Sequence, residues 1–439
     1  MKTSMTRRRA VALFGAAAPG SVMALAACGS AGGAGPAGSG ATIQPVSVRF
    51  LGRESGSEVP VYKQAVDTFN AAQSRVKIDL EAATGDFDQK LQTMVAGGTT
   101  PDSGYLHSQN VPTYVVLGVA APLDTYAKKD KAILDAYLPA AVDSYRFRNV
   151  VYGVSDVATS LVMCVNRAIF AKAGASAPAE KWTWNDYTAT AQRIASATRD
   201  SGIFPAGGFT DNNDWPAVLW QNGADLLDKD RKQVTIDRPE AAEAVTWLAD
   251  QVAKTHLHQA PADVGPKGNE QDFLDGKIGM LVALSSRMGI IAKGAQFDVE
   301  VVHLPTSKQR VTRTACGGTA MYKGTKAGDG VWEFFKYLST DDFQWSMAKV
   351  GGIIFPAGKQ VANDPQLFAG QFPKSPKVTV DALAYARTEP YIVRYVDMKN
   401  EANKQLSAVW KGESSVRDAL MRAKTAMDPI VADAVSQMK

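Results

Sequence analysis

The alternation between two hydrophobic periods near the start of the folded region most constrains what this chain can fold into. Apolar residues alternate with polar ones over 46–50 and repeat at helical spacing over 61–69. They alternate again over 76–80 and return to helical spacing over 87–95. Strand, helix, strand and helix joined by short connections predict parallel strands flanked by helices, so the fold class is α/β.

Later segments continue this pattern. The continuous apolar run over 278–284 suits a buried parallel strand. At 237–240 an aspartate cap, an early proline and a glutamate predict the start of a helix. We further expect a strand over 160–166, a short helix closed by Gly174, a helix start at 183–186 and a mostly helical stretch from about Thr379.

The length of the chain predicts two lobes. The sequence has 439 residues, whereas single cores stop growing near about 250–300 residues. Residues 28–45 are rich in Gly, Ala, Ser, Pro and Thr and read as a flexible tether. The folded part is therefore expected from about Val46 to Lys439.

The first 27 residues resemble a bacterial lipoprotein signal peptide. A basic start and a mildly apolar stretch lead to Leu25-Ala26-Ala27-Cys28, so we expect cleavage before Cys28 and lipidation of its thiol. Gly15, Pro19 and Gly20 interrupt the stretch, which argues against a membrane-spanning helix. The arginines at 7–9 fit twin-arginine export and the general secretory route equally well. Either route predicts an exported protein that is anchored to a membrane.

The charge balance gives no case for a nucleic-acid partner. The chain has 48 Lys and Arg against 44 Asp and Glu, and the signal segment holds four of the basic residues and no acidic one. The remainder is therefore formally neutral. Cys164 and Cys316 either form a bridge or stay apart as buried thiols, and we expect the latter. We expect no metal and no cofactor, and no nucleotide-binding or hydrolase motif stands out.

Eight segments carry motifs in a fixed order, at 98–102, 118–124, 152–155, 161–167, 170–174, 182–187, 220–224 and 273–280. In this order they resemble the family 1 extracellular solute-binding proteins, the substrate-capturing subunits of ABC importers of the maltose-binding-protein type. Three departures from the family pattern concern Ser155, Cys164 and the segment 285–287, where many members carry a tryptophan that stacks on sugar. The last change puts the ligand class in doubt.

The resemblance implies a periplasmic-binding-protein-like fold, with two α/β lobes joined by a hinge that the chain crosses three times. By position we expect crossings near 155–158, 284–286 and 321–324. A small solute would bind in the cleft between the lobes, and closure would present a shape that the permease recognises. The expected boundaries are 46–155 with 286–322 for lobe one, and 156–285 with 323–439 for lobe two.

Several candidate ligand contacts follow strand ends. Arg53 and Glu54 follow the first strand, and Asp102 and Tyr105 lie at the third, where open α/β sheets bind ligands. A solvated loop is the alternative for the first pair, and a helix-capping role is the alternative for Asp102.

Other candidates lie at the expected crossings. Ser155 and Asp156 would face the ligand, with a purely hinge hydrogen-bonding role as the alternative for Asp156. Arg287 offers a fork of donors to hydroxyls or a carboxylate, or else forms a surface ion pair. Gly317 and Gly318 would let the backbone approach the ligand, or simply form a turn.

Aromatic residues provide the remaining candidates. Trp215 and Trp220 lie in one early helix of lobe two, where one should be core and the other a stacking platform, and we favour Trp215 as the platform. Tyr391 would close one side of the cleft, with ordinary packing as its alternative. His107 is expected to be a loop residue without a role.

Three functions remain open on the sequence. The first is a monomeric, lipid-anchored binder that feeds a mono- or oligosaccharide to ABC permease subunits. The second is a binder of the same fold for an anionic polyol phosphate or a peptide-like solute, suggested by Arg287 and the missing tryptophan. The third is a secreted hydrolase.

Overall fold

The computed structural model describes residues 45–53, 59–84, 86–211, 214–351, 355–369 and 373–438. All of them belong to one compact unit of the chain, Gln44–Lys439. The signal segment, Cys28, nearly all of the tether and Glu54 lie outside the described residues. Their expected roles therefore stay predictions. Among the described helices, none combines the length and apolar character needed to cross a bilayer.

The strands follow the predicted pattern. Val48 and Phe50 are fully buried in the first strand, and the run 278–284 forms a strand with the predicted bounds. The predicted strand over 160–166 is the second half of a longer one. The strands are β1 (Val46–Arg53), β2 (Val76–Ala83), β3 (Ser103–His107), β4 (Arg146–Phe147), β5 (Val150–Val151), β6 (Val154–Asn166), β7 (Phe204–Gly207), β8 (Ile278–Leu284), β9 (Val299–Val302), β10 (Thr312–Met321) and β11 (Ala386–Arg387).

The helices of the first half begin and end at recognisable signals. A capping box between Thr183 and Asp186 starts α8 as predicted, and Gly174 has a φ of 59° directly after α7. These helices are α1 (Val59–Ala72), α2 (Phe87–Ala96), α3 (Val111–Val116), α4 (Asp124–Lys129), α5 (Ala132–Asp135), α6 (Pro139–Ser144), α7 (Arg167–Lys172), α8 (Trp184–Ala197) and α9 (Pro216–Gln221).

In the second half one predicted cap is wrong. Arg238, and not Asp237, is the N-cap of α10, because Pro239 is the first residue of the helix. No side chain caps this helix, since arginine has no hydrogen-bond acceptor. The chain after Thr379 is mostly helical, as predicted. The helices are α10 (Pro239–Ala249), α11 (Asn269–Leu274), α12 (Met288–Gly294), α13 (Gly328–Leu338), α14 (Asp341–Gly351), α15 (Lys359–Asn363), α16 (Val378–Asp381), α17 (Tyr395–Trp410) and α18 (Val416–Gln437).

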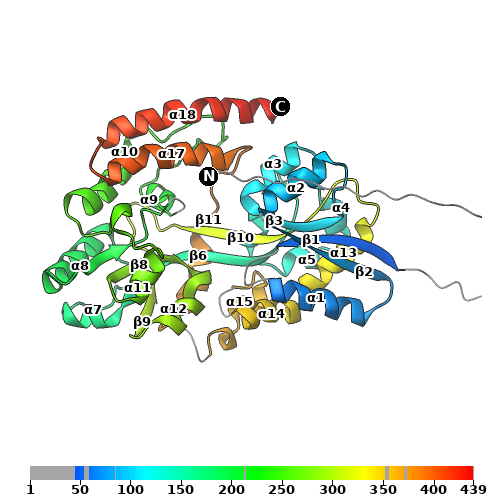
Figure 1. The fold of residues 1–439 in the computed structure, drawn as a ribbon, viewed down its shortest axis with the longest axis horizontal. Helices are drawn as coiled ribbons and strands as arrows, with labels where there is room; N and C mark the ends of the chain where they lie inside the picture. The colour runs from blue at the N-terminus through cyan, green and yellow to red at the C-terminus, as the bar shows by residue number, and fades with distance from the viewer. Residues whose placement is uncertain are drawn as a thin grey trace, which may run out of the picture. The chain divides into compact units, whose positions relative to one another are not determined.

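One continuous sheet, in the order β2-β1-β3-β10-β6-β8-β7, runs through the molecule (Figure 1). β1 pairs in parallel with β2 and β3, and β7 pairs in parallel with β8. The long strands β6 and β10 pair antiparallel and join these two groups. The result is the expected two-lobed α/β fold, with lobe one around β1–β3 and lobe two around β7–β9.

The buried cores group two segments differently from the expected lobe boundaries. Met288 and Ile291 of α12 pack with Leu281 of β8, on the lobe-two side. Trp332 and Phe334 of α13 lie in the same buried cluster as β1, on the lobe-one side. From sequence position we expected α12 in lobe one and α13 in lobe two, because each follows an expected crossing. The boundaries as a whole and the hinge itself stay predictions.

Candidate functional site

The two strands that join the lobes provide the floor of a cavity of about 340 Å³. Ala315 of β10 is paired with Thr159 of β6, and Gly317 is paired with Val157. All four residues line the cavity, since alternate residues of a strand face the same side. The floor is therefore made of small, uncharged side chains and strand backbone.

The walls come from the carboxyl ends of strands in both lobes. Arg53 ends β1, while Tyr105 and His107 lie at the end of β3, and Ser286 and Arg287 follow β8. Tyr62 of α1 and Met347 of α14 complete the lining together with Leu284 and Cys316. This arrangement is the one expected for ligand sites of open α/β sheets. The structure brings Arg53, Tyr105, Arg287 and Gly317 together, as predicted; whether they bind a ligand stays a prediction.

His107 belongs to the wall, although the sequence suggested no role for it. The hydroxyl of Tyr105 lies 3.3 Å from Nδ1 of His107, and the two rings meet edge to face with centroids 4.9 Å apart. The Arg53 guanidinium carbon lies 5.3 Å from the centre of the Tyr105 ring. Together these residues form an amphipathic wall with an aromatic face. The two-residue spacing from Tyr105 could have indicated that His107 shares its side of β3.

Arg287 is held at the cavity by a residue that the sequence did not single out. Its Nε and Nη2 donate to the two carboxylate oxygens of Glu270 at 2.6 and 2.8 Å. These hydrogen bonds raise the pKa of Arg287. Among the described residues Nη1 has no hydrogen-bond partner and can donate to a ligand. The carboxylate also neutralises most of the positive charge at this wall.

The two glycines of β10 have different roles. A Cβ atom on Gly317 would lie 2.6 Å from the hydroxyl oxygen of Tyr105, so glycine keeps the floor open below the aromatic wall. A Cβ on Gly318 would lie 2.1 Å from the carbonyl oxygen of Val154. Gly318 does not line the cavity and serves instead the close packing of β10 on β6.

Ser155 and Asp156 do not line the cavity. The hydroxyl of Ser155 donates to the carbonyl of Val157 at 2.9 Å. Asp156 is 1% exposed and accepts a hydrogen bond from the hydroxyl of Tyr62. Val157 and Thr159 face the cavity, so the alternation of β6 turns Asp156 to the other side. Asp156 therefore matches the alternative of a buried hydrogen bonder near the expected crossing.

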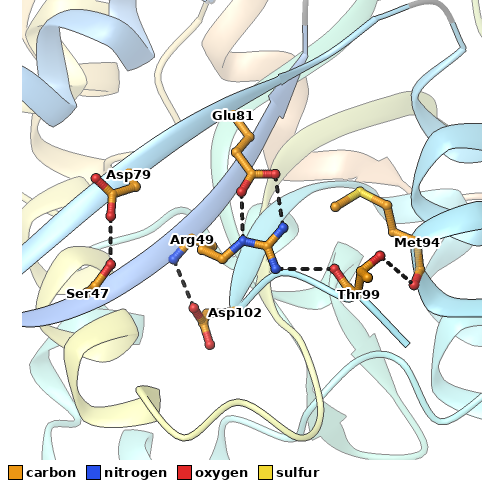
Figure 2. A network of polar contacts seen from close by, with 7 residues as sticks. All are labelled: Ser47, Arg49, Asp79, Glu81, Met94, Thr99 and Asp102. Carbon is orange, nitrogen blue, oxygen red and sulfur yellow. Dashed lines mark hydrogen bonds and ion pairs between the residues drawn. The ribbon is translucent and has the colours of Figure 1, made fainter. Parts of the chain in front are cut away.

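Asp102 is likewise held inside lobe one. Its carboxylate accepts the backbone N–H of Arg49 at 2.9 Å and the hydroxyl of Thr325 at 2.5 Å. Figure 2 shows it beneath the Arg49 side chain, whose guanidinium pairs with Glu81. Asp102 does not line the cavity and links the middle of β1 to the loop before α13.

The two tryptophans and Tyr391 are also absent from this lining. Trp215 is buried and donates from Nε1 to Asn403 at 2.8 Å, and Trp220 is buried and donates to Asp225 at 2.9 Å. Tyr391 packs edge to face on Tyr395 with ring centroids 5.0 Å apart. Neither tryptophan lines this cavity, so neither offers the expected stacking platform in it.

A buried ion pair borders the other end of the floor. Arg313 lies on the same face of β10 as Ala315 and Gly317, and its Nη2 donates to Asp214 at 2.7 Å. Burial favours the neutral form of Arg313, but the attraction of Asp214 and Glu389 outweighs this effect and raises its pKa. The pair was not predicted from the sequence.

The two remaining cysteines, Cys164 and Cys316, are both free and buried. The expectation of two separate thiols is therefore confirmed. Within the described residues no group of three or more His, Cys, Asp and Glu side chains is placed to hold a metal ion.

Comparison with known proteins agrees with this architecture. The family model described as bacterial extracellular solute-binding protein matches residues 64–379. A binding protein of Brucella abortus is 22% identical over 312 residues, which cover 69% of this chain and 74% of the relative.

Two solved structures illustrate the similarity of the fold. An ABC substrate-binding protein from Listeria monocytogenes in complex with cycloalternan is 22% identical, with a TM-score of 0.76 over 88% of this chain and 99% of the other. A binding protein for cyclic α-maltosyl-1,6-maltose from Arthrobacter globiformis is 23% identical, with a TM-score of 0.76 over 89% of this chain and 100% of the other.

Proposed function

Since this chain belongs to the bacterial extracellular solute-binding protein family, we propose that it is the solute-capturing subunit of an ABC importer whose ligand is a mono- or oligosaccharide. It binds the saccharide reversibly in the cavity above β6 and β10 and delivers it unchanged to membrane permease subunits. The fold is shared with a substrate-binding protein in complex with cycloalternan and with a binding protein for cyclic α-maltosyl-1,6-maltose.

The observation that carries this proposal is the composition of the cavity. Its floor bears no charged side chain, while its walls offer an aromatic ring at Tyr105 and hydrogen-bonding groups at Arg53, His107, Ser286 and Arg287. Saccharides present both C–H faces, which pack on aromatic rings, and hydroxyls, which need such hydrogen bonds. The segment 285–287 lacks the tryptophan that stacks on sugar in many family members, and we propose that the ring of Tyr105 takes this role.

The cavity also supports a capture mechanism. Arg53, Tyr105 and His107 belong to lobe one, and Ser286 and Arg287 follow a strand of lobe two. A solute that contacts both sets stabilises the state in which they are close together. Hinge closure of the lobes around the solute is the expected motion, and the closed form is the one offered to the permease.

The alternative of an anionic solute in this cavity has one supporting feature, the two arginines at its walls. Glu270 pairs with Nε and Nη2 of Arg287, which leaves little uncompensated charge on this arginine for an anion. A neutral polyhydroxylated ligand is favoured for this reason. We propose binding without catalysis. Complete recovery of the intact saccharide after long incubation with the protein would support this.

Export and anchoring form a second part of the proposal. The motif that ends at Cys28 supports cleavage and lipidation, and the family supports a place outside the cytoplasm. Mass spectrometry of the N-terminal peptide from cell membranes should find acyl chains on Cys28. An uncleaved N-terminus would contradict this prediction.

Ligand-dependent stability tests the proposal directly. A saccharide at a hundredfold excess over its dissociation constant should stabilise the protein by about 2.7 kcal/mol, which thermal melting detects. Removing the fork in Arg287→Ala should weaken saccharide binding about tenfold. The exposed Arg193 on α8 provides the matched control, Arg193→Ala, which should bind normally. A panel of neutral saccharides that produces no shift would contradict the saccharide assignment.

A further inference from the structure

A second and larger cavity, of about 780 Å³, lies in lobe two. We call it the basic cavity. It is bordered by the turn that links Leu227 to its bridge partner Val234, by Lys308 and Gln309, and by the segment 387–390. It shares no lining residue with the cavity above β6 and β10. The two cavities are therefore separate, and a ligand in one does not contact the lining residues of the other.

The lining of the basic cavity carries an excess of positive charge. Three acidic side chains contribute to it, namely Asp225, Asp228 and Glu240. The basic side chains of the lining number five: Lys229, Arg231, Arg238, Lys308 and Arg387.

Two of the basic residues have their charge met within the protein. Arg387 forms an ion pair with Asp225 and lies over the Trp220 ring, with its guanidinium carbon 4.7 Å from the ring centre. Lys308 pairs with Glu243 at 2.8 Å. Within the described parts of the chain, Lys229, Arg231 and Arg238 form no ion pair.

Arg231 is the most informative of these three. Its backbone has a φ of 56°, in the left-handed region, and its N–H donates to the carbonyl of Asp228 at 2.9 Å. The side chain of Asp228 accepts two further N–H groups of the same turn, from Lys232 and Gln233. The carboxylate of Asp228 is thus used in shaping the turn that presents Arg231.

The guanidinium of Arg231 is half-buried and makes one hydrogen bond, from Nη1 to the carbonyl of Tyr391 at 3.0 Å. Burial lowers the pKa of Arg231. The cation is therefore partly withdrawn from water without a carboxylate at ion-pair distance, and most of its five donors stay available. Burying a charge in this way is unfavourable unless a counter-charge joins it.

We propose that the basic cavity binds a small solute that carries phosphate or carboxylate groups, with Arg231, Arg238 and Lys229 as its anion contacts. The planar fork of arginine matches both oxyanions in a two-point geometry. The cavity is spacious enough for an organic anion and not only for a single oxyanion. This site is additional to the saccharide site and does not depend on it.

Titration calorimetry on the full chain at constant ionic strength tests the proposal, with pyrophosphate as the phosphate probe and citrate as the carboxylate probe. Binding of at least one probe is expected. In the double variant Lys229→Gln/Arg238→Gln its affinity should fall about tenfold or more. The matched control is Lys172→Gln/Arg199→Gln, which removes two exposed cations from elsewhere in lobe two and should keep the wild-type affinity.

Three outcomes would overturn the proposal: no binding of either probe, equal weakening in both double variants, or unchanged binding in the cavity variant. The saccharide panel is run in parallel on the cavity variant, where its response should equal that of the wild type. If no saccharide stabilises the wild-type protein but a probe anion still binds, the function proposed above is overturned and the anion site in the basic cavity is still supported.

Discussion

Asp156 on β6 and Asp214 beside Arg313 of β10 are two buried carboxyl groups near opposite ends of the two strands that form the cavity floor. Neither lines the cavity, and their partners differ. Asp156 is 1% exposed and meets a phenol, Tyr62, while Asp214 is 8% exposed and meets a guanidinium, Arg313. Burial raises the pKa of Asp156 to about 7, and the hydrogen bond from Tyr62 opposes this only in part. Burial raises the pKa of Asp214 to about 6 against the attraction of Arg313.

The difference teaches how each end of the floor is stabilised. One oxygen of Asp156, Oδ1, is buried without a hydrogen-bond partner among the described residues, as suits a carboxyl that keeps its proton. At the other end the buried cation Arg313 requires an anion beside it. The Asp156 end is thus stabilised by a neutral hydrogen bond and the Asp214 end by an ion pair, and substitutions separate the two.

The largest effect is expected for Asp214→Ala. This change leaves the guanidinium of Arg313 buried without its nearest anion, which should lower the free energy of unfolding by about 3–5 kcal/mol. Urea unfolding at pH 7 measures the loss. The exposed Asp211 provides the control Asp211→Ala, which should cost less than about 0.5 kcal/mol. Equal losses in the two variants would mean that the ion pair does not stabilise its end of the floor.

The next effect is a pH dependence caused by Asp156. A carboxyl whose pKa is raised by folding binds its proton more tightly in the folded state, so its contribution is present below the unfolded pKa near about 4 and is lost as the pH rises through about 7. Asp156→Asn should therefore remove roughly 2–4 kcal/mol of the stability lost between pH 4 and pH 8. Chemical unfolding at several pH values checks this. An unchanged pH profile would show that folding does not raise the pKa of Asp156.

A smaller effect is expected for Tyr62→Phe, which removes the hydrogen bond to Asp156 and should cost about 1–2 kcal/mol at pH 7. It should also raise the pKa of Asp156 further and extend the loss of stability to higher pH. Tyr137→Phe is the matched control, because the buried hydroxyl of Tyr137 has no hydrogen-bond partner within the described residues. If both variants behave alike, the hydrogen bond from Tyr62 is not what distinguishes this end of the floor.

The smallest effect is expected for an exposed pair, Glu270→Gln. The side chain of Arg287 is 46% exposed, so losing this ion pair should change the free energy of unfolding by less than about 1 kcal/mol. A loss comparable to that of Asp214→Ala would show that burial is not what separates the strong pair from the weak one.

Much of the fold could be predicted because it depends on local signals. The apolar run of β8 and the capping box at Thr183 are complete within a few residues. The prediction of Asp237 as the N-cap of α10 was wrong by one residue. An aspartate near a proline is compatible with more than one helix start, and in the structure Arg238 is the N-cap. The helices α12 and α13 join other buried clusters than their positions in the sequence suggested, since only packing decides which core receives a helix.

The candidate site was predictable only where it follows strand ends, as at Arg53, Tyr105 and Arg287. Thr159 was missed because its role depends on the register between β6 and β10, which are far apart in the sequence. The same register places Asp156 on the other face. Trp215 was expected to stack on ligand, but a tryptophan at the start of an apolar helix fits a core equally well, and its partner Asn403 lies far along the chain.

The bare floor of the cavity has a practical consequence. Val157, Thr159, Ala315 and Gly317 present little more than backbone and methyl groups, so recognition is left to residues that follow strand ends. Among these residues the exposed Arg287 should be replaceable with the least disturbance of the interior, whereas Tyr105 belongs to the buried core of lobe one. Mutagenesis to change the ligand specificity, or to attach a fluorescent reporter, can therefore target the wall residues and leave β6 and β10 unchanged.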